Sequence, residues 1–210
     1  MCKYANHVHL KFVDASIPEG SHICWIFDNQ KEPATLLPKF FKGGLDDNEM
    51  IWWFLGQIGA EAYETELENM GVDVPTCKES KQLRFSPMLD DVWDDDKLIP
   101  EKVVDRWRGV HEQAIASGYR SVRGGGDMGW LVKYGKETIQ RVIEFESRFN
   151  TLTTTHPITA ICLYNASLFD GATILDALRT HPMTLIRGQI MKNPYYIEPE
   201  EFLSMKRKHR

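Results

Sequence analysis

Short apolar runs alternate with helix-like segments along this chain, and that alternation constrains the fold more than any other feature. Six runs are rich in β-branched and aromatic residues, and most of them lead through a polar turn into a stretch with helical spacing. Strands buried on both faces have such continuous apolar runs, and parallel neighbours need a helical crossover between them. The predicted strands cover residues 22–27, 49–55, 83–86, 121–126, 158–164 and 183–190.

This order of elements predicts an α/β fold, with a mostly parallel sheet of about six to seven strands and helices on both faces. Ligands of such sheets bind beyond the carboxyl ends of the strands, so the residues that follow each run are the candidates for a site. The predicted helices cover residues 28–44, where Gly43-Gly44 is expected to stop the first one, and 60–70, 101–117, 136–150, 168–180 and 198–210.

A length of 210 residues with 42% hydrophobic content is enough for one substantial core, and we expect a single domain over residues 1–210. Residues 1–20 form an N-terminal extension with a short edge strand around 8–13. Residues 87–100 carry five aspartates around Trp93 and are interpreted as an acidic loop or lid, because the spacing of an EF-hand is missing. Residues 198–210 form a C-terminal helix with a basic end.

The charge and cysteine pattern exclude several classes of protein. A net charge of −5 and a pI near 5.8 do not fit a broad nucleic-acid surface, so no direct nucleic-acid partner is expected. Four widely spaced cysteines suit reduced thiols in the cytoplasm. The N-terminus has no apolar signal region, and no run approaches the roughly 18 apolar residues of a membrane span. We therefore expect a cytoplasmic protein with no membrane partner.

The first strand-to-helix turn lacks the features of a phosphate-binding loop. Residues 27–33 contain no glycine, and Asp28 stands where a phosphate would have to lie. Ser86, Ser121 and Ser167 lie in no nucleophile-elbow sequence, which disfavours a catalytic triad. The sequence thus predicts a protein that is not an enzyme and needs no cofactor.

A glycine-rich motif, residues 123–130, gives the strongest local indication of a site. Three consecutive glycines followed by an acid and an indole suit either close approach of a ligand or a capped turn with the indole in the core. Arg187 is expected in the last strand, paired with Asp127 or Asp28. The candidate ligand-binding residues are Phe27, Asp28, Trp53, Gly125, Gly126, Asp127, Trp130, Tyr164 and Arg187.

Two strands carry residues that could bind a soft metal. His22 and Cys24 are two apart and point to one face of their strand, and Cys162 joins them if its later strand is the neighbouring one in the sheet. Buried strand cysteines usually act as small hydrophobes, and a three-ligand site needs a fourth donor. We therefore predict no metal site, and keep these three residues as the alternative set.

Several local motifs together resemble the MEDS domain, the sensory domain of methanogens and methylotrophs that is named partly for the regulator of dichloromethane dehalogenase. The resemblance runs from about residue 20 to residue 203, and its C-terminal block is the most specific part. The motifs are His22-Ile-Cys24, Phe41-Lys-Gly-Gly-Leu45, Gly126-Asp-Met-Gly-Trp130, Cys162-Leu-Tyr164, Leu175-Asp-Ala-Leu-Arg-Thr-His-Pro182 and Asn193-Pro-Tyr-Tyr196.

The resemblance implies a signal-input module that perceives small organic molecules, on a three-layer scaffold similar to RecA and KaiC but without their phosphate loop. A chain of this length leaves no room for an output domain, so we expect signalling through an output protein, either a histidine kinase or a transcription regulator. A homodimer is left open. Two alternatives also remain: a degenerate nucleotide-binding protein, and a thiol or metal redox sensor that uses Cys24 and Cys162.

Overall fold

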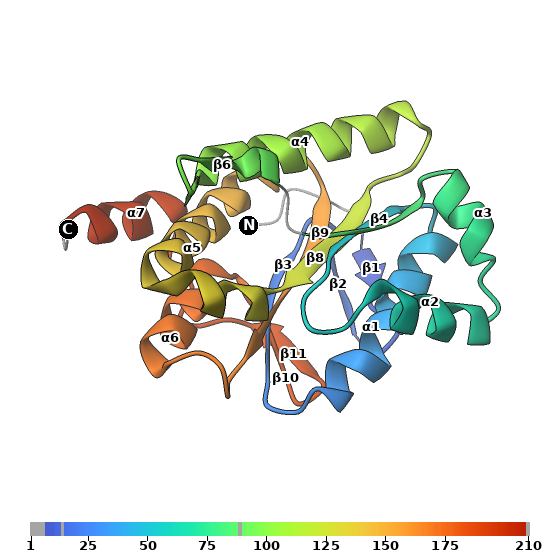
Figure 1. Ribbon diagram of the computed structural model, residues 1–210, viewed down its shortest axis with the longest axis horizontal. Helices are drawn as coiled ribbons and strands as arrows, with labels where there is room; N and C mark the ends of the chain where they lie inside the picture. The colour runs from blue at the N-terminus through green and yellow to red at the C-terminus, as the bar shows by residue number, and fades with distance from the viewer. Residues whose placement is uncertain (1–6, 14, 88–89, 209–210) are drawn as a thin grey trace.

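The computed structural model describes residues 7–13, 15–87 and 90–208, and a seven-stranded sheet forms the middle layer (Figure 1). Neighbouring strands in this sheet are parallel except for the edge pair β10–β11. In spatial order the strands are β11 (Gln189–Lys192), β10 (Met183–Ile186), β3 (His22–Phe27), β9 (Ile158–Asn165), β8 (Val122–Asp127), β4 (Met50–Phe54) and β5 (Leu83–Ser86).

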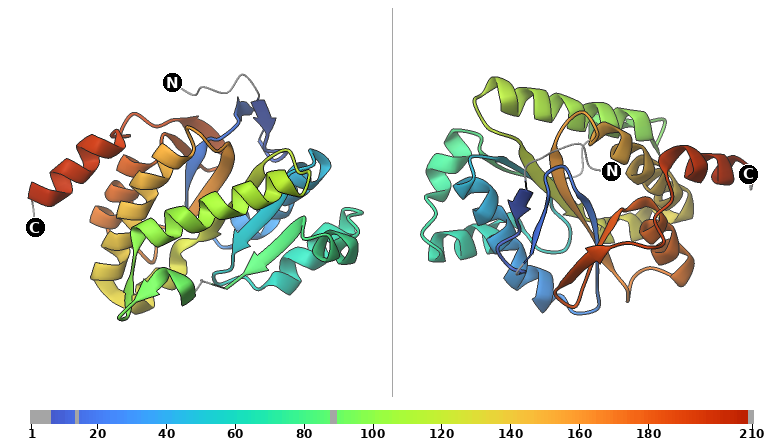
Figure 2. Two further views of the ribbon diagram at one scale, coloured as in Figure 1. Left: turned by 90° about the horizontal axis from the view of Figure 1, so that it is seen from above. Right: turned by 180° about the vertical axis from the view of Figure 1, so that it is seen from behind.

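Helices cover both faces of the sheet, so the predicted three-layer α/β fold is confirmed (Figure 2). Trp52 and Trp53 are both fully buried but belong to different faces, because successive strand residues alternate. One face packs against α4 (Pro100–Ala116), α5 (Gly135–Leu152), α6 (Gly171–Thr180) and α7 (Pro199–Lys208). The other packs against α1 (Lys31–Asp46), α2 (Ala60–Asn69), α3 (Val74–Glu79) and a hairpin of β1 (His7–His9) and β2 (Ser16–Pro18).

Local sequence explains where several helices begin. Pro100 occupies the start of α4, where its missing N–H costs nothing. The Asp170 carboxylate accepts a hydrogen bond from the Thr173 N–H at 2.8 Å and caps α6, and Asp73 caps α3 in the same way through Thr76. Of these helices, α4 lines the candidate site and α6 ends at His181, one of its residues.

Two predictions about local structure were wrong. The segment 183–190 is not one strand, because Arg187 and Gly188 take left-handed backbone angles, φ 50° and 70°, and turn the chain from β10 into β11. Arg187 is therefore exposed in a turn and is not a buried strand residue paired with Asp127 or Asp28. Gly43 and Gly44 lie inside α1, where a Cβ on Gly44 would approach Arg123 to 3.0 Å.

The three segments set apart by the sequence all carry regular structure. The N-terminal extension holds the β1–β2 hairpin, which is separate from the main sheet, instead of an edge strand. The acidic loop contains a 3₁₀ turn, η1 (Asp90–Val92), and a small hairpin, β6 (Trp93–Asp94) and β7 (Lys97–Leu98), whose Leu98 is in the core. Predictions for residues 1–6, 14, 88–89 and 209–210 lie outside the described residues.

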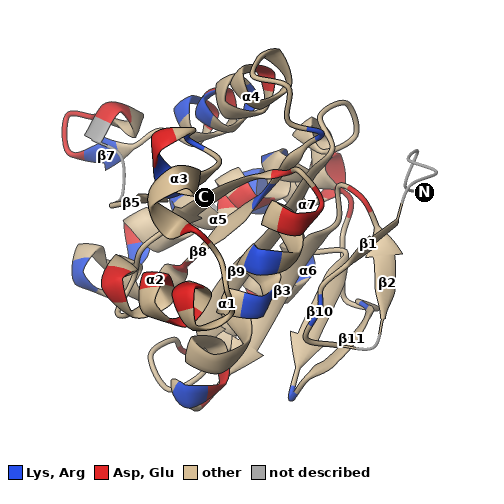
Figure 3. Ribbon diagram, turned by 90° about the vertical axis from the view of Figure 1, so that its right-hand side faces the viewer, with Lys and Arg blue, Asp and Glu red and all other residues tan. Residues whose placement is uncertain are grey.

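Charged side chains gather on the helices and connecting segments, while the strands of the central sheet carry few of them (Figure 3). Acidic residues are frequent along α2, which faces solvent with most of its surface. Among the described helices, none has the length and apolar character needed to cross a membrane.

Candidate functional site

An apolar cavity of about 30 Å³ lies between the sheet and the helices α4 and α5. Its walls come from α4, α5, the β4 and β8 strands, and the 3₁₀ segment η2 (Met128–Tyr134) that follows β8. Three polar residues, His22, Glu146 and Cys162, complete the lining. The apolar walls include Phe54, Leu98, Val103, Trp107, Met128 and Trp130.

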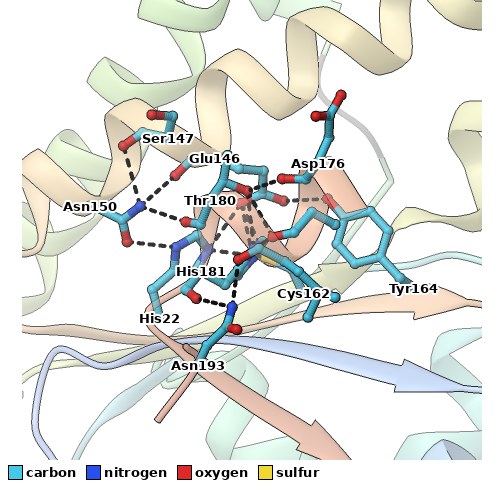
Figure 4. A network of polar contacts seen from close by, with 12 residues as sticks. His22, Glu146, Ser147, Asn150, Cys162, Tyr164, Asp176, Thr180, His181 and Asn193 are labelled. Carbon is cyan, nitrogen blue, oxygen red and sulfur yellow. Dashed lines mark hydrogen bonds and ion pairs between the residues drawn. The ribbon is translucent and has the colours of Figure 1, made fainter. Parts of the chain in front are cut away.

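The polar side of the cavity belongs to a buried group of four side chains, His22, Glu146, Cys162 and His181, which we call the donor cluster (Figure 4). They come from β3, α5, β9 and the residue that ends α6. One carboxylate oxygen, Oε2 of Glu146, lies 3.0 Å from His22 Nε2, 3.6 Å from His181 Nε2 and 3.4 Å from Cys162 Sγ. The cluster therefore converges on a single point under α5.

Hydrogen bonds outside the cluster fix both imidazole rings. Asn150 donates through its amide nitrogen to three backbone carbonyls, including that of Thr180 at 2.7 Å, so its Oδ1 is left to accept from His22 Nδ1 at 3.0 Å. The Nδ1 of His181 donates to the Ala177 carbonyl at 2.7 Å. Each ring therefore presents Nε2 to the cluster, and that of His181 has no hydrogen-bond partner among the described residues.

Burial sets the protonation states in the cluster. It lowers the pKa of His181 to about 3, an effect that His22 increases and Glu146 opposes, so His181 is neutral. Burial alone would raise the pKa of Glu146, but His181, His22 and Cys162 together bring that pKa below its usual value. Burial and the nearby carboxylate raise the pKa values of Cys162 and Tyr164 well above normal. The cluster thus holds a carboxylate beside a protonated thiol and a protonated phenol.

Gly125 and Trp130 are the residues of the predicted ligand-binding set that line the cavity. Asp127 accepts hydrogen bonds from the N–H groups of Gly129 at 2.8 Å and Gln57 at 3.1 Å, and caps η2. The glycines of the motif mainly make room for neighbouring protein atoms. A Cβ on Gly125 would collide with the Ile161 carbonyl, and one on Gly126 would lie 2.9 Å from Phe54 Cβ.

The remaining predicted residues do not meet in one cleft. Phe27 and Trp53 are buried on the opposite face of the sheet from Tyr164, whose hydroxyl donates to Glu146 Oε1 at 3.2 Å. Asp28 is exposed at the glycine-free turn between β3 and α1, and Arg187 is exposed in the β10–β11 turn. The cavity lies beneath helices, away from these two turns.

Sequence reasoning found half of the donor cluster. Strand alternation paired His22 with Cys24, and Cys162 was added as a residue of a possible neighbouring strand. The structure places the two strands side by side, but Cys24, the register neighbour of Cys162, lies outside the cluster. Glu146 was missed because it sits mid-helix among other glutamates, without a motif. His181 was assigned to the end of α6, which the structure confirms, but the burial of its ring against His22, with centroids 4.0 Å apart, has no sequence signature.

Comparison with solved structures supports the fold. The flagellar accessory protein FlaH from Methanocaldococcus jannaschii superposes with a TM-score of 0.61 at 16% identity, over 88% of this chain and 83% of that one. A KaiC-like protein from Pyrococcus horikoshii OT3 gives a TM-score of 0.56 at 15% identity, over 84% and 76% of the two chains. At such low identity these likenesses concern the RecA-type fold alone.

Comparison of sequences identifies the family. The transcriptional repressor DcmR of Methylorubrum extorquens (strain DSM 6343 / CIP 106787 / DM4) is 28% identical over 164 residues, which are 78% of this chain and 58% of the repressor's length. The family model described as "MEthanogen/methylotroph, DcmR Sensory domain" matches residues 21–182. Because that match includes the sheet strands β3, β4, β5, β8 and β9 together with the donor cluster, the chain belongs to the MEDS family of sensory domains.

Proposed function

We propose that this protein is a non-enzymatic cytoplasmic sensor that binds a small organic molecule in the cavity between the sheet, α4 and α5. The observation that carries this proposal is an apolar cavity with one polar side, the usual composition of a small-molecule site. The family's sensory description and its occurrence in methanogens and methylotrophs favour one-carbon and methylated compounds as the class to test.

The size of the cavity suggests how binding would produce a signal. A volume of about 30 Å³ has room for roughly one water molecule, so a larger ligand must displace part of the wall. The wall includes Leu98 of β7 and Trp130 of η2, two short segments outside the main sheet. The β6–β7 hairpin contacts η2 through the rings of Trp93 in β6 and Tyr134 in η2, whose centroids are 5.0 Å apart, and Tyr134 in turn lies 5.5 Å from Trp130. Ligand binding would shift the population of these segments between two arrangements.

The output would pass to a partner protein, a transcription regulator or a histidine kinase. Support comes from the similarity to a transcriptional repressor, of which this chain spans 58% of the length. The helix α7 extends from the body of the domain and ends in Lys206, Arg207 and Lys208 (Figures 1 and 2). Lys206 is paired with Asp176, so the basic surface offered to a partner is that of the exposed Arg207 and Lys208.

Tryptophan fluorescence tests the ligand site directly, because Trp107 and Trp130 line the cavity. We expect a saturable change with at least one compound in a panel of one-carbon and methylated molecules, added to protein freed of metal by a chelator. Val103→Phe fills the cavity and should abolish the response, while Val104→Phe, one position along α4 and outside the cavity lining, should keep it. Flat titrations across the panel, or a full response in Val103→Phe, would contradict the proposal.

A further inference from the structure

We propose that the donor cluster binds one divalent transition-metal ion of the zinc class, with His22 Nε2, His181 Nε2, the Glu146 carboxylate and the Cys162 sulfur as its four ligands. This inference stands on the arrangement of the donors and does not rest on the proposed ligand-sensing function. The four donor atoms lie within 4.8 Å of one another, and all four residues are buried.

The distances between donors fit a tetrahedral site. Zinc bonds of about 2.0–2.3 Å at tetrahedral angles place neighbouring donor atoms roughly 3.3–3.6 Å apart. The carboxylate oxygen of Glu146 lies 3.0 Å from His22 Nε2 and 3.6 Å from His181 Nε2. Cys162 Sγ lies 3.4 Å from both His22 Nε2 and Glu146 Oε2. Small side-chain movements would therefore centre an ion among the four groups.

The surroundings of the donors resemble the outer shell of a metal site. Metal-binding histidines usually donate their second ring N–H to a carbonyl or carboxylate oxygen, which fixes the tautomer. Here Nδ1 of His22 meets the Asn150 side-chain carbonyl, and Nδ1 of His181 meets the Ala177 backbone carbonyl. The second oxygen of Glu146 accepts from Tyr164. Three of the four ligands are thus already oriented.

The charges in the cluster also fit a divalent ion. Binding would replace the S–H bond of Cys162 by a metal–sulfur bond and release one proton to solvent, with no change of oxidation state. The thiolate and the Glu146 carboxylate then carry two negative charges, which the ion neutralises in a buried site. The Nε2 lone pair of His181, which otherwise has no hydrogen-bond partner among the described residues, gains a bond.

A metal-free explanation accounts for less of the cluster. If His22 were a charged imidazolium paired with Glu146, the 3.0 Å contact between them would be explained. A protonated Cys162 thiol donating to the same oxygen would explain the sulfur contact as well. The approach of His181 Nε2 to that oxygen at 3.6 Å would not be explained, because the proton of this ring lies on Nδ1. Calcium and magnesium prefer oxygen ligands, so two imidazoles, a thiolate and a carboxylate favour zinc or cobalt.

Four protein ligands would complete the coordination of the ion, as in structural zinc sites. They come from β3, β9, α5 and the end of α6, so the ion would join the middle of the sheet to two helices of one layer. The cavity, which His22, Glu146 and Cys162 also line, lies directly beside this point.

Metal analysis of the reduced protein tests the inference without any organic ligand. We expect one equivalent of zinc after exposure to zinc and removal of excess. Cobalt(II) added to chelator-treated protein should give the visible bands of a tetrahedral ion and a thiolate-to-cobalt charge-transfer band. Failure of wild-type protein to take up either metal overturns the inference, and leaves the fluorescence test of ligand binding unaffected.

Matched variants identify the ligands. Cys162→Ala should lose the charge-transfer band and weaken cobalt binding by more than 100-fold, beyond the 10–100-fold typical of outer-shell changes. Cys24→Ala removes an equally buried cysteine at the neighbouring register position and should keep both. His181→Gln should weaken binding as Cys162→Ala does, whereas His111→Gln, at a buried histidine of α4, should not. If Cys162→Ala keeps the band or Cys24→Ala loses it, the assignment is wrong. Should the ligand variants not fold, the wild-type cobalt spectrum still decides whether a thiolate binds the ion.

Discussion

Two glutamates, Glu49 and Glu146, are both fully buried, but their neighbours differ in kind. Glu49 belongs to an arginine cluster, which we define as Glu49, Asp47, Arg120 and Arg123. The Arg123 guanidinium donates to Glu49 at 2.5 Å, to the His9 and Phe40 carbonyls and to Asp47. Arg120 donates to the other oxygen of Glu49 at 3.0 Å. The charges of the arginine cluster are paired and the N–H donors of Arg123 are occupied, as expected of a structural network.

In the donor cluster, by contrast, the described residues do not pair every buried polar atom. Glu146 faces two imidazoles and a thiol, and His181 Nε2 is buried without a hydrogen bond among the described residues. A native core leaves few such groups unsatisfied, and an ordered water, a ligand or an ion commonly completes them. Burial of a carboxylate therefore does not by itself indicate function. What distinguishes the two sites is whether protein groups alone satisfy them.

The largest expected effect comes from opening the arginine cluster. Arg123→Met removes the main counter-charge of Glu49, and we expect a loss of about 3–5 kcal/mol in the free energy of unfolding, because a buried charge loses its partner. Urea denaturation measures it. Adding Glu49→Gln to Arg123→Met should recover part of the loss. A loss below about 1 kcal/mol would show that Arg120 alone is a sufficient partner for Glu49.

Zinc should act on the donor cluster alone. At a free concentration of 100 times its Kd, an ion that binds only the folded state adds about 2.7 kcal/mol, which for a chain of this size raises Tm by roughly 5–11 °C. Differential scanning fluorimetry with and without a chelator measures the shift. Cys162→Ala should abolish it, and Arg123→Met should melt lower but keep it. A shift that survives Cys162→Ala would place the ion elsewhere.

The outer shell of the donor cluster gives a smaller effect. Asn150→Ala removes the group that orients His22, and we expect zinc affinity to fall about 10–100-fold, or roughly 1.4–2.8 kcal/mol. Asn150→Asp keeps an oxygen that accepts from His22 Nδ1 and should retain more of the affinity. Competition with a chromophoric chelator measures both values. Equal losses in the two variants would show that Asn150 acts through its own helix and not through His22.

Much of the fold follows from the sequence because buried parallel strands have a distinctive pattern. The runs that became β3, β4 and β9 are largely continuous and apolar, whereas β5 and β8 also contain arginine and serine or glycine; the ends of all five were predicted to within one residue. The failures have local causes. Arg187 takes a left-handed backbone angle that no apolar pattern indicates. A Gly-Gly pair is compatible both with the end of a helix and with close packing inside one, and Gly43 and Gly44 pack against Arg123.

The candidate site could be predicted only in part, because it depends on which way helices face. Strand alternation grouped His22 with Cys24, and the later strand of Cys162 was considered a possible neighbour; in the structure Cys162 meets His22, and Cys24 is outside the cluster. Whether Glu146 of α5 points toward that face depends on the rotation of the helix, which tertiary packing sets. The rule that ligands bind beyond strand ends directed attention to Asp28 and Arg187, both of which are exposed in turns away from the cavity.

The smallest expected effect concerns His111, a buried histidine that belongs to neither cluster. Burial lowers its pKa, the ring of His156 at 5.1 Å adds to this, and Glu112 opposes it. Its folded-state pKa is thus below its unfolded value of about 6.5, so the unfolded chain takes up the proton first. Stability from the neutral ring is present above pH 6.5 and is lost as the pH falls below that value. His111→Gln should therefore flatten the decrease in the free energy of unfolding from about pH 6.5 to 5, measured by urea denaturation. An unchanged slope would assign acid sensitivity to other groups, with the histidines of the donor cluster as the next to test.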